Sequence, residues 1–181
     1  NWAEAQRIPW GILILFGGTL LRLQPGGTAI YGGTNNSSPA DVVRLETSAG
    51  TAVYSRDSIY HGDFWMGGEI WFKQSGERLF TRYATIFSAA SSAPDDMIYR
   101  GSFGTASLRS VQSVAHSTAA GRIAAIPTAR TVTPIHDDTE VRFFEDEHAD
   151  FVTRRALPRF VVGPDSHPGR GRFVFWSSDG S

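Results

Sequence analysis

The chain has 181 residues, 41% hydrophobic and 12% aromatic, with a formal net charge of -1 at pH 7. This length suits one domain with a sizeable core, and the balanced charge excludes a global attraction to nucleic acid or to an anionic membrane. Because there is no cysteine, disulfides, thiolate zinc sites and cysteine nucleophiles are also excluded. Nineteen glycines and nine prolines separate short apolar runs, a pattern typical of all-β proteins. We predict a single antiparallel β-sandwich domain spanning residues 1–181.

The N-terminal run from Ile8 to Leu21 carries no charge over fourteen residues. A membrane-spanning helix needs about 20 apolar residues, and Arg22 and the QPGG at 24–27 end this run early. We therefore expect no membrane span here but a buried strand pair. The glycine pairs at 17–18 and 26–27 predict turns, with strands in 11–16, 19–24 and 28–31.

The next segment, 38–50, changes its hydrophobic period. Ser38 suits a helix N-cap and Pro39 the first helical position, followed by Val42, Val43 and Leu45 near one helical face. This pattern predicts a short helix between strands. A second helix-compatible spacing occurs further along, at Leu108, Val111 and Val114.

An aromatic-rich stretch, HGDFWMGGEIWFKQSGERLFTRYATIF, occupies residues 61–87. QSGE at 74–77 predicts a hairpin turn, with RLFTRYATIF at 78–87 as the second arm because its residues alternate with period two. The double glycine at 67–68 predicts a bulge or the start of a central strand. Most of these aromatic rings are expected in the core, and Trp65 is expected to face either that core or a neighbouring subunit.

The remaining sequence contains short β-type runs separated by turn residues. They are RIAAIP, RTVTPI, TEVRFF, RFVVG and GRFVFW, at 122–127, 130–135, 139–144, 159–163 and 171–176. The expected turns are HDD, EDEHAD and GPDSHPGRG.

Residues 136–150 hold seven carboxylates and one basic residue, Arg142. Carboxylate oxygens are ligands for hard cations, so Asp137, Asp138, Glu145 and Asp146 are candidates for a Ca²⁺ site at a subunit interface. The spacing lacks the alternating ligands and central glycine of an EF-hand. The competing interpretation is two solvated acidic loops around a strand at 139–144. No other cofactor is expected.

Arginines follow this acidic block. Adjacent patches of opposite charge suit subunit pairing, so Arg154, Arg155 and Arg159 are predicted interface residues together with Trp65. Solvated loops produce the same pattern.

We find no catalytic motif in the sequence. There is no G-x-S-x-G nucleophile elbow, and GGTAIYGGT lacks both the P-loop lysine and the dinucleotide-binding glycine pattern. A hydrolase would need a histidine within hydrogen-bond reach of a serine or carboxylate in a pocket. We therefore expect a protein that is not an enzyme.

Three segments resemble motifs of the jelly-roll capsid subunits of picornavirus-like RNA viruses of the dicistrovirus, iflavirus and marnavirus types. FWMGGEIWFK at 64–73 is similar to an aromatic segment leading into a glycine-containing strand, with Met66 where the family has arginine. TEVRFFEDEHADF at 139–151 is similar to an acidic-hydrophobic motif, with Arg142 in place of proline. RFVFWSSDGS at 172–181 is similar to the family's final strand without its closing phenylalanine.

The resemblance implies a jelly-roll sandwich with short helices in its connections. It also implies a structural virion protein that assembles with other capsid subunits into an icosahedral shell around genomic RNA, located in the virion and, during assembly, in the host cytoplasm. Two alternatives remain: a carbohydrate-binding β-sandwich that uses Trp65, Trp71 and Trp176 as a stacking surface, and a receptor-binding phage or surface protein.

Overall fold

The computed structural model describes residues 19–34, 40–48, 51–104, 108–128 and 137–180. The strands of the first two sheets are β1 (Leu20–Leu23), β2 (Ala29–Gly33), β3 (Val42–Ser48), β4 (Thr51–Asp57), β5 (Ile70–Phe72), β6 (Arg78–Thr81), β7 (Thr85–Ser88) and β8 (Tyr99–Ser102). The later strands are β9 (Val111–Ser117), β10 (Arg122–Pro127), β11 (Glu140–Glu145), β12 (Phe151–Ala156), β13 (Arg159–Val162) and β14 (Asp165–Pro168). Two single-turn 3₁₀ helices, η1 (Ala93–Asp95) and η2 (Asp137–Thr139), lie in connections.

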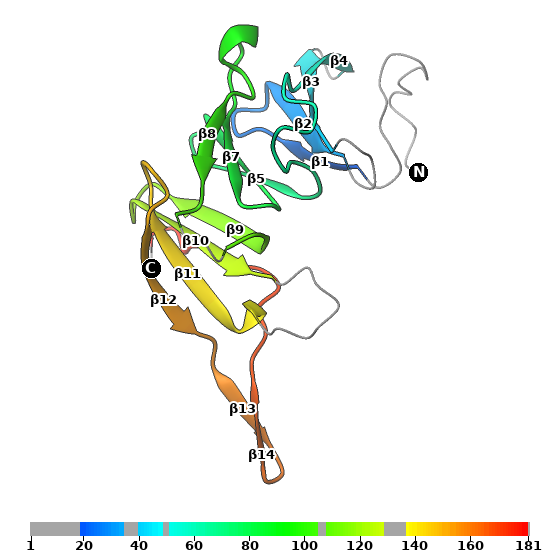
Figure 1. Cartoon of the computed structure of the whole chain (residues 1–181). Helices are drawn as coiled ribbons and strands as arrows, with labels where there is room; N and C mark the ends of the chain where they lie inside the picture. The colour runs from blue at the N-terminus through cyan, green and yellow to red at the C-terminus, as the bar shows by residue number, and fades with distance from the viewer. Residues whose placement is uncertain (1–18, 35–39, 49–50, 105–107, 129–136, 181) are drawn as a thin grey trace, which may run out of the picture. The chain divides into compact units, whose positions relative to one another are not determined.

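The predicted all-β antiparallel sandwich class is confirmed (Figure 1). The sheets have the orders β1-β2-β3-β4, β5-β6-β7-β8 and β12-β11-β10-β9, and a two-stranded sheet is formed by β13 and β14. Every neighbour in these sheets is also the neighbour in sequence, so each four-stranded sheet is an up-and-down meander. A jelly roll instead pairs strands that are distant in sequence through Greek-key connections.

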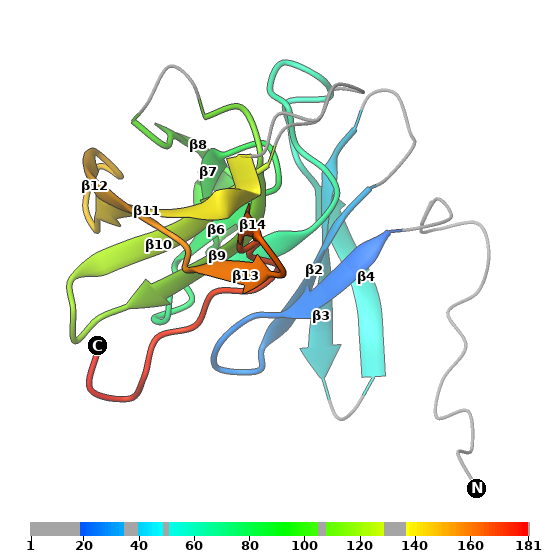
Figure 2. The same cartoon turned by 90° about the horizontal axis from the view of Figure 1, so that it is seen from below.

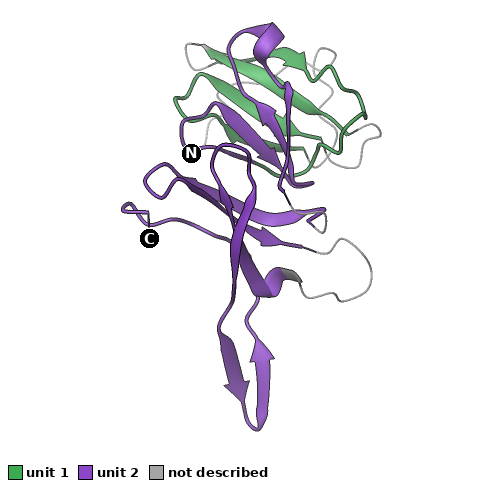
Figure 3. Ribbon diagram, turned by 60° about the vertical axis from the view of Figure 1, so that its left-hand side comes forward, with its two compact units in different colours: residues 1–70 green, residues 71–181 purple. Residues whose placement is uncertain are grey.

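The chain divides into two compact units, residues 1–70 and 71–181 (Figure 3). The single domain over 1–181 stays a prediction. Within the parts of the chain that the structure describes, no helix is long and apolar enough to cross a membrane.

In unit 1, β1 to β4 pair in sequence, and β2, β3 and β4 run side by side (Figure 2). The helix predicted in 38–50 is wrong, because 42–48 is strand β3. Val42 to Leu45 are four consecutive buried residues. A strand that is covered on both faces can bury four residues in a row, whereas an amphipathic helix buries only the residues on one face.

The predicted strands at 19–24 and 28–31 correspond to β1 and β2, joined through Gly26 and Gly27 at positive φ. The predicted burial is wrong for β1, whose four residues are exposed. The run at 11–16 lies outside the described residues.

The double glycine of unit 1 lies in the loop before β5, not in a strand or bulge. A Cβ atom on Gly33 would stand 2.2 Å from the backbone oxygen of Gly68, and Gly68 donates its N–H to the oxygen of Thr34 at 3.1 Å. Two backbones therefore meet here at a distance that only glycine permits.

In unit 2 the QSGE turn is confirmed, since the Lys73 N–H bonds the Arg78 oxygen at 2.9 Å. The second arm is not one strand: β6 and β7 are separated by a turn at 82–84, where Ala84 has φ of 60°. The helix-compatible spacing at 108–114 leads instead into strand β9. One core joins the sheets β5–β8 and β9–β12, and it includes Trp71, Phe80, Ile86, Phe103, Val114, Ile123 and Phe144.

The later strand predictions are confirmed for β10, β11 and β13, and 130–135 lies outside the described residues. GRFVFW at 171–176 forms no strand, while β12 and β14 arise in 151–156 and 165–168, where none was predicted. The β13–β14 hairpin projects from the β9–β12 sheet (Figure 1).

Candidate functional site

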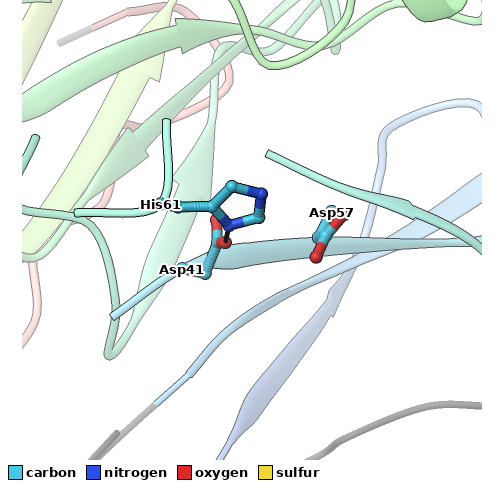
Figure 4. A group of neighbouring side chains, drawn as sticks. All are labelled: Asp41, Asp57 and His61. Atoms are coloured by element: carbon cyan, nitrogen blue, oxygen red, sulfur yellow. Dashed lines mark hydrogen bonds and ion pairs between the residues drawn. The ribbon is translucent and has the colours of Figure 1, made fainter. Parts of the chain in front are cut away.

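Three metal-ligating side chains meet at one end of the β3–β4 hairpin in unit 1 (Figure 4). Asp41 directly precedes β3, Asp57 ends β4, and His61 lies in the loop that follows. The register pairs Val43 with Asp57, so both carboxylates reach the same end of the hairpin. One ligand atom from each of the three residues lies within 4.8 Å of the others.

Asp41 is the buried member of this group. Its Oδ1 accepts the Val42 N–H at 2.7 Å, and its Oδ2 lies 2.9 Å from Nδ1 of His61. Burial raises the pKa of Asp41, and the Val42 hydrogen bond and the His61 charge oppose that rise. Thr34 fixes the backbone of Asp41, because its Oγ1 accepts the Asp41 N–H at 2.7 Å.

Two carboxylates and an imidazole are a donor set that divalent transition metals accept. The same contacts have a structural role without an ion, since His61 satisfies the buried carboxylate and ties the loop after β4 to the start of β3. This cluster was not predicted from the sequence, because a helix in 38–50 would not bring Asp41 opposite the end of β4.

A second polar network lies in unit 2, around His116 of β9. Its side chain is 0% exposed, its Nε2 lies 2.9 Å from Oδ1 of Asp146, and its Nδ1 accepts the Gln74 N–H at 3.2 Å. Lys73 binds the same Asp146 oxygen at 3.2 Å and Glu77 at 2.9 Å. The network therefore connects the QSGE turn to β9 and to the turn after β11.

The charges of this network follow from its burial. Burial lowers the pKa of His116, which favours the neutral ring at pH 7. Because Nδ1 accepts the Gln74 N–H, the proton of the neutral ring lies on Nε2, facing Asp146. Burial alone would raise the pKa of Asp146, but the Lys73 hydrogen bond and the interactions with His116 lower it. Because both ring nitrogens are engaged and no part of the side chain is exposed, His116 has no nitrogen free to take a proton from a substrate.

The structure separates the four predicted calcium ligands. Asp137 and Asp138 lie in η2, before β11, whereas Glu145 ends β11 and Asp146 follows it. A six-residue strand spans roughly 20 Å, so the two pairs do not form one site.

Glu145 already has protein partners. Its carboxylate accepts the backbone N–H groups of Glu147, His148 and Asp150. Burial would raise the pKa of Glu145, and these three hydrogen bonds lower it. The carboxylate therefore closes the turn between β11 and β12.

The predicted interface residues are all exposed. Trp65 in unit 1 is 71% exposed, so it does not face the core. Arg154 and Arg155 lie on β12 and Arg159 on β13, both strands exposed along their length. Arg154 lies 3.5 Å from Glu140, and the Arg159 guanidinium bonds Ser166.

The three tryptophans of the predicted sugar-stacking surface do not form one. Trp71 belongs to the buried core of unit 2, and the indole N–H of Trp176 bonds the backbone oxygen of Ala115 at 3.1 Å. Of the three, only Trp65 presents a largely exposed ring.

No protein-family profile and no curated protein sequence matches the chain. Among solved structures, it is similar to hydrazine synthase from Kuenenia stuttgartiensis at 16% identity and a TM-score of 0.52, over 76% of this chain and 36% of that one. It is also similar to a putative 6-phosphogluconolactonase from Bacteroides uniformis at 14% identity and a TM-score of 0.52, over 88% of this chain and 44% of that one. The chain thus spans less than half the length of either protein, and identities this low show a likeness of fold alone.

Proposed function

We propose that this chain is a non-catalytic scaffold of the β-propeller type that works by associating with protein partners, in the first place with other copies of itself. The observation that carries the proposal is the strand order. Three successive sheets are four-stranded sequential meanders, and a four-stranded meander is the repeating blade of a propeller.

The burial of the strands in unit 2 supports this interpretation. In the β5–β8 sheet, β6 and β7 are almost wholly buried while β8 alternates between exposed and half-buried residues. In the β9–β12 sheet, β9 and β10 are largely buried and β12 is fully exposed. Burial therefore decreases toward the fourth strand of each sheet. We expect this decrease when sheets stack face to face and the fourth strand lies outermost.

Exposed apolar side chains support association. Large hydrophobic residues are more than 40% exposed on β1, β4, β12 and β13, in the loop at 58–69 and in 172–176. Apolar surface gathered on strands, especially edge strands, is typical of protein-binding surfaces. The exposed arginines 154, 155 and 159 on β12 and β13 add a residue type that is enriched at interfaces.

A capsid subunit that encloses RNA in a virion is the competing proposal for a self-associating protein, and it depends on the three resembling segments. Of these, 139–151 contains β11 and the start of β12, 64–73 contributes the short β5, and 172–180 contains no strand. The sequential meanders do not supply the Greek-key order of a jelly roll, so we favour the propeller-type scaffold.

Light scattering on the purified chain tests the proposal. We expect particles whose mass is a multiple of the 19.8 kDa chain at micromolar concentrations. A chain that remains monomeric up to about 100 µM, well above typical dissociation constants of stable complexes, would contradict self-association.

A further inference from the structure

Arginines give one part of unit 2 a charge that the chain as a whole lacks. Residues 151–176 contain five arginines and one acidic residue, Asp165, although the net charge of the chain is -1. All five arginines are exposed: Arg154, Arg155, Arg159, Arg170 and Arg172. The balanced total charge therefore coexists with a local cationic surplus, and such a surplus attracts polyanions.

The segment 171–176, GRFVFW, lies against one face of the β9–β12 sheet. Val174 donates its N–H to Ser113 Oγ of β9 at 3.2 Å. The Trp176 ring lies 5.9 Å from the ring of Phe143 on β11, edge to face. Val174 and Trp176 are half-buried, so these contacts hold one side of the segment on the sheet and leave its other side open.

The register of β12 places Arg155 on the face that carries this segment. Thr153 is paired with Phe143, and Arg155 is paired with Val141. Paired residues of antiparallel strands point to the same face, as do residues two apart on one strand. Arg155 therefore points to the same face as Phe143, and the neighbouring Arg154 points to the opposite face.

Three of the arginines have no acidic partner. Among the residues that the structure describes, no carboxylate pairs with Arg155, Arg159 or Arg172. The Arg159 guanidinium bonds Ser166, and the Arg172 guanidinium lies 5.4 Å from the centre of the Phe173 ring. These three positive charges are therefore not neutralised within the described chain.

Exposed aromatic rings lie next to two of these arginines in the sequence. Phe173 is 60% exposed and Phe175 is 81% exposed, and their rings lie 6.3 Å apart. Phe160, which follows Arg159, is 53% exposed. In an ordinary edge segment the rings would point to the core and the arginines to solvent. Here both kinds of side chain point to solvent.

We propose that an arginine–phenylalanine surface, formed by Arg155, Arg159, Arg172, Phe173 and Phe175, binds single-stranded nucleic acid. Guanidinium groups form charge-assisted hydrogen bonds with phosphates, and exposed aromatic rings stack on unpaired bases. RNA and DNA share these two chemical features. The proposal goes beyond self-association and does not depend on it.

A single strand fits this surface better than other polyanions do. The bases of a duplex are already stacked on one another, so they offer no free face to the phenylalanine rings. An acidic polypeptide would neutralise the arginines, but its carboxylates do not stack on aromatic rings. Only an unpaired strand uses both the charge and the rings.

Fluorescence anisotropy with labelled single strands of about 20 nucleotides, oligo-dT and oligo-rU, tests the proposal. We expect the purified chain to bind with an affinity that falls with salt, with a logarithmic slope of roughly -2, because three arginines contact phosphates and each contact contributes about -0.7. A stronger signal with oligo-rU identifies RNA as the ligand, and a stronger signal with oligo-dT identifies DNA.

Matched variants test the two parts of the surface. Phe173→Ala/Phe175→Ala should weaken binding at least about 5-fold, the smallest loss expected for one stacked base. Arg155→Ala/Arg172→Ala should weaken binding and reduce the salt slope by about 1.4. The controls are Arg154→Ala, on the opposite face of β12, and Trp65→Ala, an exposed ring in unit 1, and both should bind within about 2-fold of the unaltered chain.

The same titrations state what would overturn the proposal. No anisotropy change up to about 100 µM protein at low salt would overturn it, as would equal losses in the surface variants and the controls. Polyglutamate or anionic lipid vesicles that compete as well as the oligonucleotide would also overturn it, and would assign the surface to an acidic polypeptide or to a membrane. A chain that binds the oligonucleotides but stays monomeric would contradict the scaffold proposal alone.

Discussion

Truncation of Phe144 tests whether the sheets β5–β8 and β9–β12 share one core. The side chain is 0% exposed, and its ring lies 4.8 Å from Phe103, the residue that follows β8. Replacing a fully buried phenylalanine by alanine costs about 3–5 kcal/mol, because transfer energy is lost and a cavity remains. With a urea m-value of about 2 kcal/mol/M, we expect Phe144→Ala to lower the unfolding midpoint by roughly 2 M.

The matched control is Phe151→Ala. Phe151 lies 6.1 Å from the Phe144 ring but is 41% exposed, so its truncation should cost no more than about 1 kcal/mol. Urea unfolding at fixed protein concentration, followed by circular dichroism, measures both changes. Equal effects of the two substitutions would refute a shared core.

Three further predictions concern other parts of the chain. Gly33→Ala should destabilise unit 1 by about 1–3 kcal/mol in thermal unfolding, because the new methyl group would meet the backbone oxygen of Gly68. Gly32→Ala should cost less, because its methyl group would meet the end of the flexible Leu21 side chain. Stability should fall as the pH drops below 6.5, the ordinary pKa of histidine, because burial lowers the pKa of His116 and the unfolded chain therefore binds a proton that the folded chain does not. In urea titrations, His116→Gln should flatten this dependence of stability on pH. An unchanged slope would contradict the assigned burial of His116. Trp65→Ala should change stability by less than about 0.5 kcal/mol and lower the acrylamide-quenchable fluorescence, whereas Trp71→Ala should cost about 3–5 kcal/mol; the reverse order would refute the assigned burial.

The all-β class and several turns could be predicted because they depend on local chemistry. Glycine pairs and QSGE mark reversals of the chain wherever they occur, and the apolar runs at 122–127 and 139–144 are long enough to read as strands. The helix predicted in 38–50 failed because Val42, Val43 and Leu45 satisfy helical spacing as well as strand burial. Only tertiary packing distinguishes the helix from the strand, because it buries Arg44 together with Val42, Val43 and Leu45.

Strand order and the side-chain clusters could not be predicted in the same way. Sequential and Greek-key sheets use the same alternating strands, so local pattern does not separate a meander from a jelly roll. Asp41 and Asp57 meet only through the register of the β3–β4 hairpin. His116 and Asp146 meet because β9 and β11 lie on either side of β10, near the same end of the sheet. No residue spacing in the sequence predicts this arrangement.

Electron microscopy of the purified chain distinguishes a propeller-type scaffold from a capsid subunit. We expect small discrete particles built from a few copies, in which four-stranded sheets are arranged as blades around a channel. Icosahedral shells of two-sheet subunits, or isolated single chains, would contradict it.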